Sequence, residues 1–180
     1  MKADLLGPAL SVLEEHGTPA ALAGGMALAV YGVVRATFDF DLLCLDPRLL
    51  QPTWWTGLAR VGVRIEICRG DRDDPFVGLV RLAADDQADV DVLVGQRRWL
   101  EGVLARRQAV AVAGRNLPVV DPADLILLKL DARGSQDLFD VQLLLQSPGG
   151  EEWARDVTDR LPDVPPAIER TWNEIRSAAG

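Results

Sequence analysis

The sequence predicts an α+β protein with a C-terminal helical part. Segments in which apolar and polar residues alternate, as in a half-buried strand, occur within the first 120 residues, where helical patterns separate them. From residue 121 onward only helical patterns occur. We therefore expect an α/β core at residues 1–120 and a helical region at residues 121–180 that packs on it as a single compact unit.

The elements of the core follow from local patterns. Segment 37–45 is the clearest strand, because its apolar residues alternate with Asp39 and Asp41. Asp46 and Pro47 suit the N-cap and the first position of a helix. In chain order, the expected helices span 4–15, 26–33, 46–60 and 97–107, and the expected strands span 20–23, 37–45, 63–68, 77–82, 88–94, 108–112 and 115–120.

The helices of the C-terminal region are marked by their ends. Asp121 as an N-cap, followed by Pro122 and then by Asp124, is a strong helix start. Gly134 and Ser135 are expected to end that helix and to cap the next one. The expected helices span 121–132, 136–146, 151–160 and 166–178.

The composition excludes several classes of protein. The chain has 180 residues, a formal net charge of −8, one His and two Cys. It therefore cannot supply the usual zinc ligand sets, and Cys44 and Cys68 lie in apolar runs, as buried thiols of a reducing compartment do. The negative charge argues against a broad nucleic-acid-binding surface.

Neither secretion nor membrane insertion is expected. The N-terminus lacks the clean apolar segment of a signal peptide. The longest uncharged run, 17–34, is interrupted by Pro19 and several glycines, which would leave backbone groups unpaired in lipid. We expect a cytoplasmic protein with no membrane contact.

The charge is unevenly distributed along the chain. Seven Asp and two Arg lie between residues 71 and 91, whereas five Arg and one Glu lie between residues 92 and 120. Two interpretations are open: the acidic region binds a metal beside an anion held by the basic region, or both regions are solvated surface.

A pair of glycines is the first candidate for chemistry. Gly24 and Gly25 lie between an expected strand and an expected helix. A backbone without Cβ atoms lets an anion approach closely, and the N–H groups of the following helix would point at it. A tight strand-to-helix turn needs the same two residues, so this alternative stays open.

Aspartates form the second candidate. Asp39 and Asp41 project from one face of a strand and can share cations, unless they belong to a solvent-exposed polar face. Two hard cations also need a third carboxylate from another strand. Asp91 fits best, because Val90 and Val92 flank it, and Asp89 is the alternative in the same phase.

Taken in order, these residues resemble the polymerase-β-like nucleotidyltransferase superfamily. Its signature is an apolar residue, Gly-Gly or Gly-Ser, a short spacer, D-x-D and later an Asp between apolar residues; here it reads LAGGMALAVYGVVRATFDFDLL and ADVDVLVG. The likeness is closest to minimal members that include the AbiEii-type abortive-infection toxins, since Tyr31-Gly32 and Arg35-Ala36-Thr37 also match. The resemblance implies a mixed, twisted sheet flanked by helices.

The C-terminal region resembles the same group. The segment VVDPADLILLKLDARGSQDLFDVQLLL has the form P-x-D-L, a helix with a Lys, then an Arg and Q-D-x-x-D. Lys129 is one of only two lysines among 19 basic residues, and the resemblance implies that it contacts the nucleotide phosphates or an acid in the cleft. Arg133, Asp137 and Asp140 are weaker candidates, with ion pairing on the helix surface as the alternative.

The resemblance implies a magnesium-dependent nucleotidyltransferase. Asp39, Asp41 and Asp91 would be catalytic and would hold two Mg²⁺ ions, with Mn²⁺ as an alternative. A hydroxyl of an RNA, a protein or a small molecule would attack the α-phosphate of a nucleoside triphosphate and release pyrophosphate. The residues implied to bind the nucleotide are Gly24, Gly25, Arg35, Thr37 and Lys129.

Two other functions remain open. The chain is alternatively a non-catalytic member of the fold, acting as a nucleotide-binding module or as a partner, with a cognate antitoxin, in a toxin–antitoxin-like pair. It is alternatively a small-molecule nucleotidyltransferase of the antibiotic-modifying kind. A deep acceptor pocket lined with acids would favour the antibiotic-modifying type, whereas a basic open groove beside residues 97–107 would favour an RNA acceptor.

Overall fold

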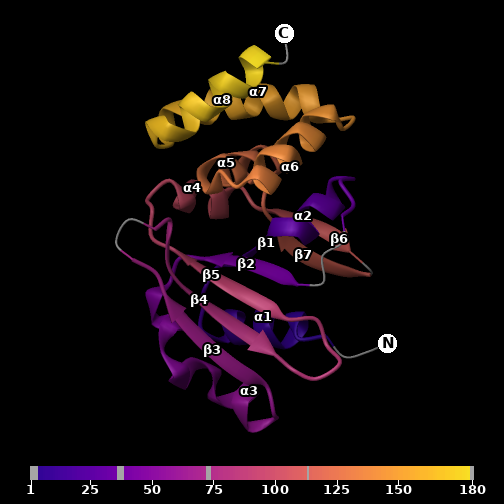
Figure 1. The fold of residues 1–180 in the computed structure, drawn as a ribbon. Coiled ribbons are helices and arrows are strands. Elements are labelled where there is room, and N and C mark those ends of the chain that lie inside the picture. Colours follow the sequence, from indigo (N-terminus) through magenta and orange to yellow (C-terminus); the bar gives the residue numbers. More distant parts are fainter. Residues whose placement is uncertain (1–3, 36–38, 72–73, 113, 179–180) are drawn as a thin grey trace. The chain divides into compact units, whose positions relative to one another are not determined.

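The structure is a computed structural model that describes residues 4–35, 39–71, 74–112 and 114–178. The chain forms two compact units (Figure 1). The first contains Met1–Ala27 and Arg35–Val120, and the second contains Leu28–Val34 and Asp121–Gly180.

A seven-stranded mixed sheet forms the centre of the first unit, in the strand order β3-β4-β5-β2-β1-β7-β6 (Figure 1). β2 pairs with β5 in parallel, β1 pairs with β7 in parallel, and the other neighbours are antiparallel. The strands are β1 (Ala21–Ala23), β2 (Phe40–Cys44), β3 (Arg64–Arg69), β4 (Phe76–Ala83), β5 (Val90–Gly95), β6 (Gln108–Val112) and β7 (Arg115–Val119). All seven expected strands are therefore present in the described part of the chain.

Helices flank this sheet, which confirms the predicted fold class. They are α1 (Leu6–Glu15), α3 (Thr56–Arg60) and α4 (Leu100–Ala105), together with the 3₁₀ helices η1 (Pro47–Leu50) and η2 (Pro52–Trp55). The helix α2 (Gly24–Val30) begins in the first unit and ends in the second. It starts two residues earlier than expected, so that both glycines belong to its first turn.

The expectation of one continuous helix at residues 46–60 is wrong. Asp46 caps η1 as predicted, with its side chain accepting a hydrogen bond from the Arg48 N–H. The chain then becomes extended at Gln51, with φ −100° and ψ 126°, and restarts at Pro52. The proline ring disfavours a helical residue before it and removes a backbone donor, so the segment divides into η1, η2 and α3.

Within residues 121–178, which the structure describes, the second unit contains helices and no strand, as expected: α5 (Pro122–Ala132), α6 (Ser135–Gln146), α7 (Gly150–Arg160), η3 (Leu161–Asp163) and α8 (Pro166–Ala178). The Asp121 carboxylate caps α5 by accepting a hydrogen bond from the Ala123 N–H at 3.1 Å. At the other end, α5 ends at Ala132 as expected, and Gly134 is the N-cap residue of α6. The residue between them, Arg133, adopts the left-handed conformation, with φ 59°.

Within the described residues, no helix has the length and apolar character needed to cross a bilayer.

The fully buried residues include strand positions such as Leu42, Val80 and Val92, so the sheet supplies much of the core of the first unit. Val90 and Val92, on both sides of Asp91, are fully buried, and β5 pairs with β2 along this segment.

Candidate functional site

A row of register partners crosses four strands of the first unit. Ala23 of β1 is paired with Asp41 of β2, and Asp41 is paired with Asp91 of β5. Asp91 is in turn paired with Arg81 of β4. Register partners on neighbouring strands project to the same face of a sheet. Two of the predicted catalytic carboxylates and an arginine therefore lie side by side, next to the end of β1.

Gly24, directly after β1, lies against Asp41. Its φ of +58° is in the left-handed region, and a Cβ atom at this position would overlap the Asp41 carboxylate. Glycine is thus required both by the backbone conformation and by the close approach. The structure therefore brings Gly24 of the predicted glycine pair and Asp41 of the D-x-D pair together at one end of β1 and β2.

The side chain of Asp91 is bound by Arg81. The guanidinium donates from Nε to Oδ1 at 2.8 Å and from Nη2 to Oδ2 at 2.6 Å, the bidentate geometry in which arginine binds carboxylates most strongly. The Asp91 side chain is only 11% exposed, against 43% for Arg81. These hydrogen bonds and the charge of Asp91 raise the pKa of Arg81, with smaller contributions from the charges of Asp89 and Asp39.

The two other predicted acids lie one residue before their strands. Asp39 precedes β2 and is exposed, and Asp89 precedes β5. The Phe40 N–H donates to the Asp89 carbonyl oxygen at 2.9 Å, so the pairing of β2 with β5 continues to this level. Because strand side chains alternate, Asp39 shares a face with Asp41, and Asp89 shares it with Asp91.

The donor chemistry of this face suits a hard divalent cation, since carboxylate oxygens are the ligands that Mg²⁺ and Mn²⁺ prefer. The arrangement of the donors is less complete. Across residues 4–35, 39–71, 74–112 and 114–178, no group of three or more His, Cys, Asp or Glu side chains is placed to hold a metal ion. Asp39 and Asp41 are the fitting donors, and the third predicted ligand, Asp91, is engaged by Arg81.

Two of the predicted nucleotide-binding residues lie at or beside the segment 36–38. Thr37 falls outside the described residues. Arg35 is half-buried and belongs to the first unit, as do Gly24 and Asp41. A role of either residue in nucleotide binding stays a prediction.

Lys129 lies in the second unit, where it bridges two carboxylates of α6. Its Nζ atom is 2.7 Å from Asp137 Oδ1 and 2.8 Å from Asp140 Oδ2. The Asp140 side chain is fully buried and also accepts a hydrogen bond from Gln136 at 3.1 Å. The lysine and the two weaker candidate acids therefore form one ion cluster between α5 and α6, and a nucleotide contact of Lys129 stays a prediction.

Arg133, the remaining weak candidate, connects the end of α5 to α8. Its Nη2 atom donates to the Ala167 carbonyl at 2.6 Å and to the Thr171 hydroxyl at 2.8 Å. These bonds offset the cost of the left-handed backbone at a residue that has a Cβ atom. The pairing of Arg133 with the acids of α6, considered from the sequence, is replaced by these contacts with α8.

Arg160 is a half-buried charge that the sequence analysis missed. Its Nη1 atom is 2.6 Å from Asp121 Oδ1 and 3.0 Å from Asp124 Oδ2, and Asp124 is fully buried. The two acids that mark the start of α5 in the sequence thus also anchor α7.

Burial and the charge of Asp121 raise the pKa of Tyr31, whose ring packs edge-on against the Trp153 ring with 5.7 Å between the ring centroids.

Arg81 was also missed, although the sequence contains a signal for it. It is the only charged residue in the apolar segment FVGLVRLA, which precedes a short acidic loop and a second strand. A hairpin centred on that loop places residue 81 opposite residue 91. An arginine facing a predicted metal-binding carboxylate could therefore have been identified from the hairpin register.

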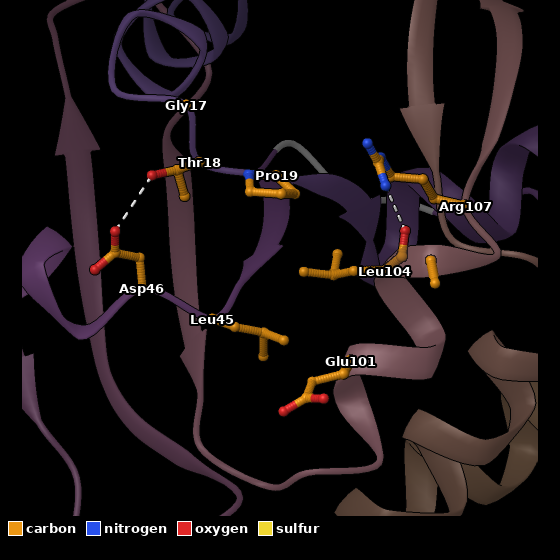
Figure 2. A pocket seen from close by; sticks show the side chains of 9 residues that line it. Gly17, Thr18, Pro19, Leu45, Asp46, Glu101, Leu104 and Arg107 are labelled. Atoms are coloured by element: carbon orange, nitrogen blue, oxygen red, sulfur yellow. Dashed lines mark hydrogen bonds between the residues drawn. The ribbon is translucent and has the colours of Figure 1, made fainter.

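A pocket of about 410 Å³ lies at the other end of β1 and β2 (Figure 2). Asp46 accepts a hydrogen bond from the Thr18 hydroxyl at 3.5 Å, and Arg107 donates to the Leu104 carbonyl at 2.6 Å. Both of these bonds lie within the protein. Its lining comprises Gly17, Thr18, Pro19, Leu45, Asp46, Glu101, Leu104, Ala105 and Arg107.

No model of a known protein family and no curated protein matches the sequence. Solved structures do match. The solution structure of the antibiotic-resistance factor ANT(2'')-Ia is 17% identical, with 97% of this chain and 91% of that chain covered and a TM-score of 0.51. A crystal structure of ANT(2'')-Ia in complex with adenylyl-2''-tobramycin is 15% identical, with 98% and 97% covered and a TM-score of 0.51.

A third similar structure is a putative nucleotidyltransferase from Thermotoga maritima. It is 11% identical, with 79% of this chain and 91% of that chain covered and a TM-score of 0.51. At these identities the likeness concerns the fold. The chain has the nucleotidyltransferase fold, with its mixed sheet flanked by helices.

Proposed function

We propose that the chain is a metal-dependent nucleotidyltransferase, which moves a nucleotide from a nucleoside triphosphate to a hydroxyl acceptor and releases pyrophosphate. The observation that carries the proposal is the alignment of Asp41 with Asp91 on adjacent strands, beside Gly24, in a chain with the nucleotidyltransferase fold. The spacing of the motifs in the sequence supports the same activity. AbiEii-type toxins remain the subgroup that this spacing favours.

Individual residues of the chain would have different roles in such a reaction. Asp39 and Asp41 would hold a divalent cation, Mg²⁺ or Mn²⁺. When bound, this cation would neutralise phosphate charge and lower the pKa of the acceptor hydroxyl. Asp91 would supply the third catalytic carboxylate. The backbone of Gly24 and Gly25 would bind the donor phosphates close to Asp41, because Gly24 has no Cβ atom to keep them away.

A small-molecule hydroxyl is the first acceptor to test. ANT(2'')-Ia, which is similar over nearly the whole chain, has been solved with adenylyl-2''-tobramycin. An RNA end or a protein hydroxyl would serve the same chemistry, because in each case an oxygen nucleophile attacks the α-phosphate in line. Such a transfer would gain its rate mostly from positioning and from charge neutralisation at the carboxylate row. The identity of the acceptor would therefore be selected by surfaces outside this row.

The second candidate function is a non-catalytic, nucleotide-binding member of the fold within a toxin–antitoxin-like pair. The specific observation that favours it is the pair between Arg81 and Asp91, which uses both oxygens of a carboxylate needed for catalysis. Binding of a nucleoside triphosphate without transfer to any acceptor would support this alternative.

A transfer assay tests the proposed activity. The wild type is incubated with each labelled nucleoside triphosphate, Mg²⁺ or Mn²⁺, and an aminoglycoside panel, total RNA or a protein acceptor. We expect Asp39→Ala and Asp41→Ala each to lower the transfer rate by about 100-fold or more, because each removes a ligand of the cation. Asp85→Ala, which removes an exposed acid paired with Arg64, is the matched control and should retain the wild-type rate.

Equal labelling by the wild type and both variants would reject the assigned carboxylates. Loss of labelling in Asp85→Ala as well would show that the loss reflects net charge or folding and not the site.

A further inference from the structure

We propose that Arg81 is an internal counter-cation of the carboxylate row, which positions Asp91 and competes with a divalent cation for it. The inference deepens the proposed function and rests on it, because it concerns the same carboxylates. Arg81 acts here through Asp91 and is therefore a positioning residue.

The first argument is geometric. A carboxylate that accepts both arms of a guanidinium is held in one orientation, and each of its oxygens has one lone-pair direction occupied. With 11% of its side chain exposed, Asp91 has little water available to replace these bonds. A cation that needs an Asp91 oxygen must therefore displace Arg81 or accept a weaker contact.

The second argument is electrostatic. Arg81 lies between Glu66 of β3 and Asp91 of β5, its register partners on the two sides. The charges of Asp89 and Asp39 also act on its guanidinium. Asp41 lies beyond Asp91 in the same row. Like charges on neighbouring strands repel, so a positive group at this place stabilises the acidic face when no metal is bound.

The two arguments lead to a consequence for cation binding. A divalent cation at Asp39 and Asp41 would take Asp91, the register partner of Asp41, as its third ligand, but both oxygens of that carboxylate already accept hydrogen bonds from Arg81. The cation and the guanidinium therefore compete for Asp91, and the affinity of the wild type for a free divalent cation is held low. Removal of Arg81 should strengthen cation binding, which is the opposite of what a purely structural arginine would do.

The test measures binding of Mn²⁺ alone, without nucleotide, by electron paramagnetic resonance or calorimetry. We expect Arg81→Gln to bind Mn²⁺ about 5- to 10-fold more tightly than the wild type. Arg48→Gln is the matched control. Arg48 also donates to both oxygens of an aspartate, Asp46, but at the other end of β2, and its loss should change the Mn²⁺ affinity by less than about twofold.

A double-variant cycle tests whether Arg81 affects cation binding through Asp91. If Arg81 competes through Asp91, the gain from Arg81→Gln falls below about twofold in the Asp91→Asn background. A gain that persists there overturns the competition, because it would arise from charge at a distance. Should Arg81→Gln fail to fold, Arg81→Lys keeps the charge, loses the bidentate geometry, and should give an intermediate gain.

The outcome separates this inference from the proposed function. Equal Mn²⁺ affinity of wild type and Arg81→Gln rejects the inference whether or not nucleotide transfer is observed. Tighter binding by Arg81→Gln, combined with no transfer to any acceptor, supports the inference and rejects the enzymatic activity.

Discussion

The carboxylate of Asp41 lies so close to the backbone of Gly24 that a side-chain carbon on the glycine would overlap it. The contact joins the two parts of the sequence motif, which are separated in the chain by α2 and the segment before β2. It also fixes the position of one predicted cation ligand against the backbone proposed to bind phosphate.

Substitution of Gly24 should therefore be costly for two separate reasons. Gly24→Ala introduces a Cβ atom at a positive φ and into the space of the Asp41 carboxylate. We expect a loss of about 3 kcal/mol in the free energy of unfolding, measured in urea. Gly17→Ala is the matched control, because Gly17 has a φ of +64° with nothing within 4 Å of the added carbon, and it should lose only about 1 kcal/mol. Equal losses would contradict the close approach.

Neutralisation of Asp91 should destabilise the protein, although it relieves negative charge. Asp91→Asn leaves Arg81 without its charged partner, and we expect a loss of about 1 kcal/mol because Arg81 is partly exposed. Asp39→Asn, at an exposed position before β2, should change the free energy of unfolding by less than about 0.5 kcal/mol. Thermal unfolding without metal measures both, and a stabilised Asp91→Asn would refute the ion pair.

The Lys129 cluster gives a test of the second unit. Lys129→Met removes the cation from beside the fully buried Asp140 carboxylate, and we expect a loss of about 3 kcal/mol in chemical unfolding. Asp137→Asn should cost less than about 1 kcal/mol, since that side chain is 26% exposed and Lys129 keeps Asp140. Similar losses in the two variants would show that the buried charge is not what makes the cluster important.

The two thiols should differ in reactivity. Burial, followed by the charge of Asp46, raises the pKa of Cys44 from 9.0 to about 12, whereas Cys68 is exposed. At about pH 8 an alkylating reagent should modify Cys68 and leave Cys44 unmodified until the chain unfolds. If the folded Cys68→Ser variant is modified by the alkylating reagent, the burial of Cys44 is contradicted.

The same thiol makes stability depend on pH. Between the ordinary thiol pKa of 9.0 and the folded value of about 12, the unfolded chain releases the Cys44 proton while the folded chain retains it. The contribution is complete below the unfolded value and is lost as the pH rises through this window. A Cys44→Ala variant should show a smaller loss of stability in that window, as measured by urea unfolding at a series of pH values.

Local patterns predicted most of the elements of the fold. Alternation located the strands because burial of one face of a sheet repeats every two residues. The helix expected at 46–60 divides because Gln51 precedes a proline and becomes extended. The left-handed conformation of Arg133 was not predicted, because the hydrogen bonds that accompany it go to α8, far along the chain.

The amino-acid order alone determined the fold class and the strands, and it supplied the candidate site residues: two glycines, a D-x-D pair and a third aspartate in an apolar strand. Which of these side chains meet, and what neutralises them, was decided only by the tertiary structure. The register of β2, β5 and β4 places Asp91 between Asp41 and Arg81, and the packing of α5 on α6 encloses Lys129 with Asp140. Charge pairing acts through space between residues distant in sequence, so it depends on strand order and helix packing, which local periodicity does not specify.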